Sequence, residues 1–396
     1  MRADHRSAFR KASLARLLEH LLESLELTTT QTEEAKARSA AVGAWLASAD
    51  DPGLRRLSVY FQGSTALGTT VRPIGSNEHD VDLIAHISLF ENRNPAEIKK
   101  LIGDRLKENA RYQPKLIEKT RCWRLDYANE FHLDITPSIP NPHCQNGGEL
   151  VPDRLLKCWK ATNPKAYREL FERRAALQPT LRLSKVFSED AVRAGVEPYP
   201  ENTGFKGLLR RTVQLSKRHR DIYFDRGDPS LAPISIIITT LASKSYEFCV
   251  RSFVYDSELD VVIDVLRRMP HFIDRDLQAP GVRWAVWNET TEGENFAERW
   301  NEDPRLVAAF FEWHAAIVAE VEALTEIDGI DQITKRMRDC FGKGPAERAL
   351  EVEVKSISEA RAGQRLFVAP HVGLTTTAAA ALAGAVPVRA NTFFGR

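Results

Sequence analysis

The feature that most constrains this chain is a short stretch, residues 80–87, whose odd positions are all apolar. Asp80 and Asp82 lie at even positions, and the odd positions are Val81, Leu83, Ala85 and Ile87. Because side chains alternate across a β-strand, the two carboxylates project from one face, with their roots about 6 to 7 Å apart. The stretch therefore predicts a strand that buries one face in a core and presents two acids on the other.

A third acid follows on a later predicted strand. Residues 121–127 and 131–136 flank the segment 128–130, a pattern typical of an antiparallel hairpin. In the second arm, Asp134 shares the polar face with His132 and Thr136 in an otherwise apolar run. Burying this carboxylate without a cation would be costly, and Mg²⁺ is typically bound by a few carboxylates together with substrate phosphates and water. Asp80, Asp82 and Asp134 are therefore predicted to hold Mg²⁺.

A glycine-serine pair precedes these acids. Gly63-Ser64 comes directly after a predicted strand, residues 57–61, and leads into residues 65–67. Glycine lets a backbone approach phosphate closely, and a serine hydroxyl with amides at a helix start can donate to phosphate oxygens. A Gly-Ser turn or an Asp-x-Asp pair alone is common. Their order, with a third acid on a later strand, indicates a site for a nucleoside triphosphate.

Beyond about residue 155 the sequence becomes mainly helical. Helices are predicted at 8–27 and 30–47, and later at 204–224, 231–250, 303–323 and 345–361. Strands followed by helices indicate an α+β, bilobed molecule. We expect a core with N-terminal helices over residues 1–155, a helical lobe over 156–372 that completes an active-site cleft, and a flexible C-terminal tail over 373–396.

Composition limits the partners of the chain. Its formal net charge is +1, from 55 basic and 54 acidic side chains, so small phosphorylated ligands fit better than long nucleic acid. The five cysteines are scattered and odd in number, which argues against a zinc site or a disulfide framework. The chain has no apolar run of about 18 residues and no secretory signal. We therefore expect a cytoplasmic protein without a membrane partner.

Several motifs together resemble one family, the bacterial cGAS/DncV-like nucleotidyltransferases of antiphage CBASS operons, within the polymerase-β-like superfamily. The motifs are GSTALGTTVRP at 63–73, HDVDL at 79–83, HLDITP at 132–137, TNPKAY at 162–167, LSKRHRD at 215–221, SIIITT at 235–240 and NTFFG at 391–395. The glycine-serine and acid motifs are shared by many nucleotidyltransferases, whereas the helical segments are typical of this subgroup. The resemblance spans nearly the whole chain.

The resemblance implies a bilobed polymerase-β-like core with a mixed sheet, packed on a helical lobe like that of oligoadenylate synthetases. It implies that Asp80, Asp82 and Asp134 bind two Mg²⁺ ions, for which Mn²⁺ can substitute. Gly63, Ser64, Lys217 and Ser235 would bind nucleotide. The sequence pattern supports the nucleotide-binding role of Lys217, which shares a face of its predicted helix with Lys206, Arg210 and Gln214. Ser235 lies in an apolar run, where a hydroxyl bonded to backbone is the ordinary expectation.

The function implied is synthesis of a cyclic di- or trinucleotide second messenger from nucleoside triphosphates, with ATP the expected substrate, in antiphage defence. A linear oligoadenylate or RNA-end nucleotidyltransferase and a non-catalytic nucleotide-binding scaffold stay open as alternatives. In the family, glycine-terminated tails can be conjugated by a partner. Residues 391–395 resemble such a tail, but Arg396 departs from the terminal glycine. The sequence leaves the bases, the linkage and the ring size of the product undetermined.

Overall fold

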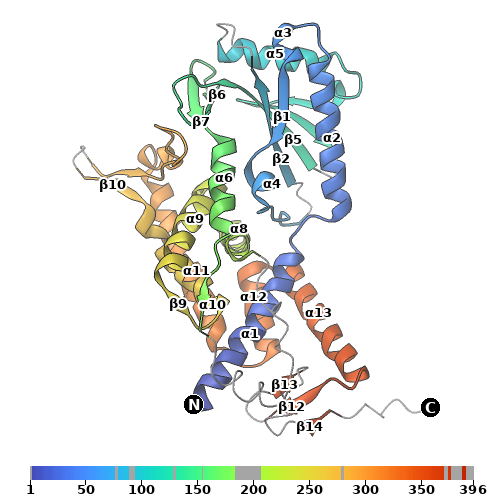
Figure 1. Cartoon of the computed structure of the whole chain (residues 1–396), viewed down its shortest axis with the longest axis vertical. Helices are drawn as coiled ribbons and strands as arrows, with labels where there is room; N and C mark the ends of the chain where they lie inside the picture. Colours follow the sequence, from blue (N-terminus) through green and yellow to red (C-terminus); the bar gives the residue numbers. More distant parts are fainter. Residues whose placement is uncertain are drawn as a thin grey trace.

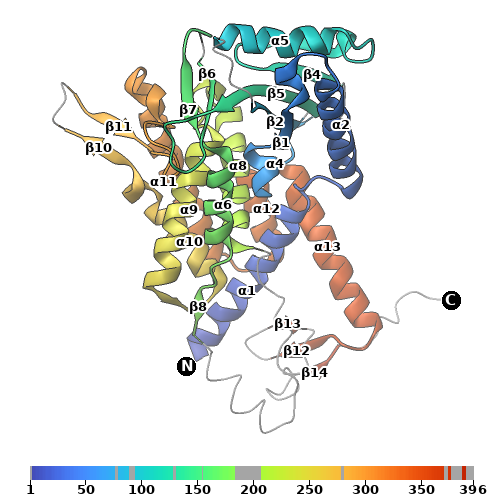
Figure 2. The same cartoon turned by 45° about the horizontal axis from the view of Figure 1, so that its top comes forward.

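A computed structural model of the chain describes residues 2–75, 79–88, 94–127, 131–153, 155–182, 207–277, 281–369, 373–375 and 386–388. It contains two lobes (Figure 1). The upper lobe is a sheet with its covering helices, and the lower, larger lobe is helical. The rotated view in Figure 2 shows the same division, with α1 and α13 running along the helical lobe. This is the α+β, bilobed arrangement that the sequence predicts.

The sheet of the upper lobe is mixed. Its strands run in the order β1 (Leu57–Phe61), β2 (His79–Ile87), β5 (Phe131–Pro140), β4 (Trp123–Tyr127) and β3 (Leu116–Glu118), and β6 (Glu149–Pro152) and β7 (Trp159–Thr162) extend it beside β5. β2 and β5 are parallel, and the other pairs in this sheet are antiparallel. The predicted hairpin is confirmed, since β4 pairs antiparallel with β5 and Tyr127 lies opposite Phe131.

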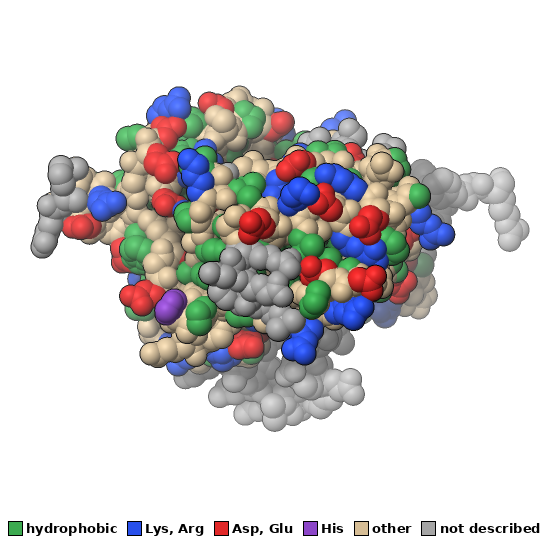
Figure 3. Space-filling model, turned by 90° about the horizontal axis from the view of Figure 1, so that it is seen from above, with side chains coloured by type: hydrophobic (Ala, Val, Ile, Leu, Met, Phe, Trp, Pro, Cys, Tyr) green, Lys and Arg blue, Asp and Glu red, His purple; other side chains and the backbone are tan. Residues whose placement is uncertain are grey.

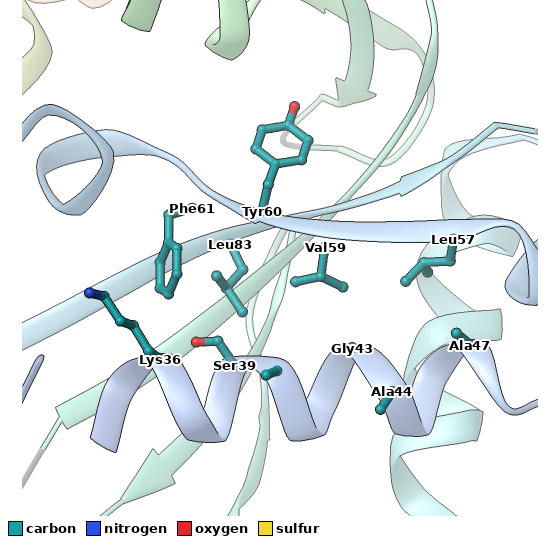
Figure 4. A pocket seen from close by; sticks show the side chains of 11 residues that line it. Lys36, Ser39, Gly43, Ala44, Ala47, Leu57, Val59, Tyr60, Phe61 and Leu83 are labelled. Atoms are coloured by element: carbon teal, nitrogen blue, oxygen red, sulfur yellow. The ribbon is translucent and has the colours of Figure 1, made fainter. Parts of the chain in front are cut away.

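One face of this sheet is buried under helices. α2 (Thr29–Ala47), α3 (Pro52–Arg55) and α5 (Pro95–Lys107) supply the covering side chains. Val81, Leu83, Ala85 and Ile87 are all buried in this core, as their alternation predicts. Figure 4 shows the same alternation on β1, where Val59 and Phe61 point toward α2 and Tyr60 points away. The opposite face of the sheet is therefore not covered by these three helices.

The helical lobe is built around α8 (Leu208–Asp225), of which residues 211–219 are all buried. The other helices are α1 (Arg2–Glu23), α6 (Pro164–Ala175), α9 (Ser235–Ser252), α10 (Glu258–Arg268), α11 (Pro304–Glu326), α12 (Ile330–Phe341) and α13 (Lys343–Ala362). The leucines of α1, such as Leu18 and Leu21, lie in the core of this lobe although they precede the sheet in sequence. The predicted domain boundaries along the chain stay a prediction.

The C-terminal segment contains short strands. β12 (Phe367–Ala369) pairs with both β13 (Gly373–Thr375) and β14 (Val386–Pro387). Paired strands thus occur inside the region that the sequence predicts to be a flexible tail. The tail motif at 391–395 lies outside the described residues. Among the helices that are described, none combines the length and apolar character needed to cross a bilayer.

Gly103 in α5 offers a test of how the sheet packs on its helices. A methyl group at this glycine would lie 2.1 Å from the Trp123 ring, whose Nε1 donates to the Lys99 carbonyl at 2.8 Å. We expect Gly103→Ala to lower the free energy of unfolding by about 2 kcal/mol despite the helix preference of alanine. Urea denaturation measures this value.

Gly227 provides the matched control, because a methyl group there would meet its nearest atom at 3.9 Å. Gly227→Ala should change the free energy of unfolding by less than about 0.5 kcal/mol. Equal effects of the two substitutions would contradict the packing described here.

Candidate active site

The strand register brings two of the predicted acids side by side. β2 and β5 pair in parallel so that Asp82 lies opposite Asp134, and Asp80 lies opposite His132. All four occupy the sheet face that α2 and α5 do not cover. The side chain of Asp80 is 55% exposed and that of Asp134 is 15% exposed, so the acids differ widely in their access to solvent.

Arg124 on β4 is the main positive group on these acids. It lies opposite Asp134 across the β4–β5 pair. Its Nε and Nη2 donate to the two carboxylate oxygens of Asp134, both at 2.7 Å, and Nη2 also donates to Asp80 Oδ1 at 2.9 Å. Its Nη1 lies 3.2 Å from His132 Nδ1. The hydrogen bond with Asp134 is the largest cause that raises the pKa of the guanidinium.

Asp82 shows that the cluster still lacks positive charge. Burial, followed by the carboxylates of Asp134 and Asp80, raises the pKa of Asp82 to about 7, although Arg124 and Lys217 oppose the shift. A divalent cation would supply the missing charge, and carboxylate oxygens are the ligands that Mg²⁺ prefers. The residue types and the shared sheet face therefore fit a magnesium site.

The side chains are not gathered around a metal position as they stand. Within the described part of the chain, no three Asp, Glu, His or Cys side chains are arranged to hold a metal ion. Arg124 instead donates to both carboxylate oxygens of Asp134 and to one of Asp80. Metal binding would require these carboxylates to exchange that partner.

The glycine-serine pair lies against the acids. Gly63 begins the short helix α4 (Gly63–Leu67) with a φ of 60°, a conformation that favours glycine. A methyl group at this position would lie 2.8 Å from Asp82 Oδ2, and the Gln62 amide donates to the Asp82 carbonyl at 2.9 Å. The start of α4, including Ser64, is thus fixed beside the carboxylate of Asp82.

The segment that leaves α4 is held by side chains of α8. Arg210, Gln214, Lys217 and Arg218 donate to the backbone carbonyls of Leu67, Thr70, Thr69 and Arg72, respectively. The distances are 3.0, 3.1, 3.1 and 3.4 Å. The predicted polar face of this helix therefore contacts backbone of the other lobe, and the position of α4 depends on α8.

Lys217 lies within the electrostatic reach of Asp82. The residue is 4% exposed, and its Nζ donates to the carbonyl and the hydroxyl of Thr69, both at 3.1 Å. Burial, followed by the charge of Arg220, lowers the pKa of Lys217 to about 7, while Asp221 and Asp82 oppose the shift. The structure thus places Lys217 toward the acids and against Thr69, just after the end of α4.

Ser235, the other residue expected to bind nucleotide from the helical lobe, is joined to α8 by a hydrogen bond. It is the first residue of α9, is half-buried, and its hydroxyl accepts a hydrogen bond from Arg220 Nη1 at 3.0 Å. The same Arg220 nitrogen donates to the Pro233 carbonyl at 3.0 Å. Ser235 is therefore linked to α8 through Arg220, and no hydrogen bond described in the structure joins it to the acids.

Arg124 was not among the residues singled out from the sequence. The hairpin pattern contained the necessary information, because a loop at 128–130 pairs Tyr127 with Phe131 and hence Arg124 with Asp134. Thr69 was also not singled out, and no pattern in the sequence marks it. It is fully buried and is identified only by its contact with Lys217.

The raised pKa of Asp82 predicts that the folded protein is destabilised when this carboxyl group ionises. An acid whose pKa is higher in the folded state stabilises the fold at low pH, and this contribution is lost as the pH rises from about 4 to about 7. Asp82→Asn should therefore raise the free energy of unfolding at pH 8 in EDTA by about 2 kcal/mol. The gain should disappear near pH 4, as urea titrations at both pH values would show.

Asp80→Asn is the control, because Asp80 accepts a hydrogen bond from Arg124 and is more exposed. It should not stabilise the protein. A gain at pH 8 with Asp80→Asn but none with Asp82→Asn would contradict this description of the cluster.

Comparisons with known proteins place the chain in a family. Residues 13–174 match the family described as Second Messenger Oligonucleotide or Dinucleotide Synthetase domain. The chain is similar to a c-di-GMP synthase of Roseivirga ehrenbergii, at 30% identity over 389 residues that cover 97% of this chain and 98% of that protein. It is also similar to the cyclic dinucleotide synthase CdnG of Bradyrhizobium diazoefficiens, at 27% identity over 409 residues that cover 96% of this chain and 94% of that protein.

The fold agrees with a solved structure as well. The structure of the Bradyrhizobium diazoefficiens CD-NTase CdnG in complex with GTP matches with a TM-score of 0.64 and 23% identity, covering 86% of this chain and 99% of that chain. The resemblance drawn from the sequence motifs is thus confirmed along the whole chain. The protein belongs to the cGAS/DncV-like nucleotidyltransferases and is a synthase of cyclic-nucleotide second messengers.

Proposed function

We propose that this protein joins two molecules of GTP into cyclic di-GMP. The observation that carries the proposal is its similarity, over nearly the full length of both chains, to a protein named as a c-di-GMP synthase. A second relative matched over almost its whole length is named as a cyclic dinucleotide synthase. These relatives favour GTP over the ATP expected from the sequence, and a dinucleotide over a trinucleotide.

We propose that Asp80, Asp82 and Asp134 hold two Mg²⁺ ions, or Mn²⁺ in their place. Bound there, such ions would neutralise the triphosphate and lower the pKa of the attacking ribose hydroxyl. The pairing of Asp82 with Asp134 supports this role, because it sets two carboxylates side by side on one sheet face. The protein itself holds the three carboxylates in fixed positions.

Four further residues are proposed to bind the donor triphosphate. Gly63 and Ser64 begin α4 beside Asp82, where backbone amides can donate to phosphate oxygens. Lys217 uses two hydrogen-bond contacts on Thr69, and an ammonium has three donors, so one can serve a phosphate. Ser235 would act together with Arg220, to which it is bonded.

Two alternatives have different physical requirements. A linear or RNA-end nucleotidyltransferase must hold a polyanion, which favours a broad basic surface. On the face of the molecule in Figure 3, basic and acidic side chains are instead interspersed. A non-catalytic scaffold would not need the acid cluster, whose three aspartates are all present. A role in antiphage defence, implied by the family, and a cytoplasmic location, expected from the sequence, stay predictions.

The direct test supplies radiolabelled ATP, GTP, CTP and UTP, singly and together, with Mg²⁺. The products are digested with phosphatase and with a nuclease specific for 3′–5′ linkages before chromatography. We expect GTP alone to give a phosphatase-resistant product that the Asp80→Ala/Asp82→Ala double variant does not make. Added duplex RNA should not be required.

The other outcomes separate the alternatives. Phosphatase-sensitive ladders would indicate linear synthesis, and a resistant product that needs ATP would indicate a different pair of bases. No product with any mixture, with or without RNA, would contradict the proposal and favour a scaffold.

Gly63 allows the proposed triphosphate site to be tested separately from folding. Gly63→Ala would bring a methyl group within 2.8 Å of Asp82 Oδ2, so we expect the rate of synthesis to fall by about 100-fold. Initial rates at saturating GTP measure this effect.

Gly75→Ala is the matched control. Gly75 also has a positive φ, of 70°, but a methyl group there has no described atom within 4 Å. Both variants carry similar backbone strain, of about 1 kcal/mol, and only Gly63→Ala should lose activity. Equal losses of activity would show that strain in the segment, rather than contact with Asp82, is responsible.

A further inference from the structure

We infer that Arg124 is a resident counter-ion of the acid cluster, which a metal must displace, and that this one side chain sets the metal affinity of the site. The inference rests on the proposed metal site at Asp80, Asp82 and Asp134. It adds a residue that tunes that site.

The guanidinium of Arg124 occupies the oxygens that a metal would use. It forms a two-pronged pair with Asp134, at 2.7 Å on each oxygen, and a third hydrogen bond with Asp80 at 2.9 Å. Such planar, charge-assisted pairs are among the stronger hydrogen bonds in proteins. Arg124 therefore holds two of the three acids together without a metal.

The place of Arg124 in β4 indicates a role at the site and not in the core. Trp123 and Leu125, its neighbours in the strand, are buried against the helices of the upper lobe. Arg124 projects from the opposite face, where the register sets it across from Asp134. Its side chain is 18% exposed, so it is largely buried beside the acids and is not a solvated surface group.

The three carboxylates cannot bind a metal ion and keep all their hydrogen bonds with the Arg124 guanidinium at the same time. A metal ion and a guanidinium that share carboxylate oxygens repel one another, and this repulsion is weakly screened inside a protein. Metal binding should therefore release Arg124 from Asp134 and Asp80. Metal alone would bind weakly, and a triphosphate, by adding oxygen ligands, would shift the exchange toward the metal-bound form.

The test measures binding of Mn²⁺ by electron paramagnetic resonance in the wild-type protein and in three variants, without nucleotide. Arg124→Gln removes the competing charge and should bind Mn²⁺ about tenfold more tightly than wild type. Arg124→Lys keeps the charge but loses the two-pronged geometry. Its Mn²⁺ affinity should lie between those of wild type and Arg124→Gln. Arg121→Gln removes a nearby positive charge from an exposed side chain and should leave the affinity unchanged.

The outcomes distinguish the inference from the metal-site proposal. If Arg124→Gln binds Mn²⁺ with equal or lower affinity, the inference is wrong while the metal site stands. Equal tightening by Arg121→Gln would indicate a general charge effect and would also overturn it. If neither wild type nor any variant binds Mn²⁺, the proposed metal site itself fails. Should Arg124→Gln not fold, Arg124→Lys alone still decides, since it must bind more tightly than wild type.

Discussion

The structure depends on how three carboxylates are kept together on one face of a sheet. Parallel pairing of β2 with β5 sets Asp82 beside Asp134. Burial, followed by the charges of Asp134 and Asp80, raises the pKa of Asp82 to about 7. The protein offsets this repulsion only in part, through Arg124 on the neighbouring strand and Lys217 on α8. The remaining deficit of positive charge is the physical basis on which we propose that the site binds metal ions together with a triphosphate.

The second constraint is the attachment of α8 to the segment after α4. Four side chains of one helix hold carbonyls between Leu67 and Arg72, and Arg211 of the same helix pairs with Glu19 and Glu26, which lie in and just after α1. The two lobes are thus joined at the point where the glycine-serine turn meets the acids. The geometry of the site is therefore a property of the interface between the lobes, and not of the sheet alone.

Much of this could be predicted from the sequence, for identifiable reasons. The alternation at 80–87 and the hairpin around 128–130 fix which side chains face the cleft, because strand periodicity is a local property. The parallel pairing of β2 with β5 is not local, and the family resemblance implied only a mixed sheet, without saying which strands pair. The burial of Lys217 against Thr69 depends on packing between lobes, which an amphipathic pattern cannot specify. The strands of the C-terminal segment were missed because its Ala-, Thr- and Gly-rich composition lacks a periodic apolar face.

The contact between Arg124 and Asp134 connects these observations. It could have been derived from the hairpin register, but its importance appears only when Asp80, on a third strand, is seen to share the same guanidinium. In the structure Arg124 holds two of the acids together, and we propose that metal and nucleotide replace it there.

The most direct test of this account is anomalous diffraction from crystals grown with Mn²⁺ and a non-hydrolysable GTP analogue. The account predicts manganese bound by Asp80, Asp82 and Asp134, with Arg124 withdrawn from Asp134 and the triphosphate beside the start of α4. A triphosphate bound in the cleft with no manganese on the three aspartates, and with Arg124 still paired to Asp134, would contradict it.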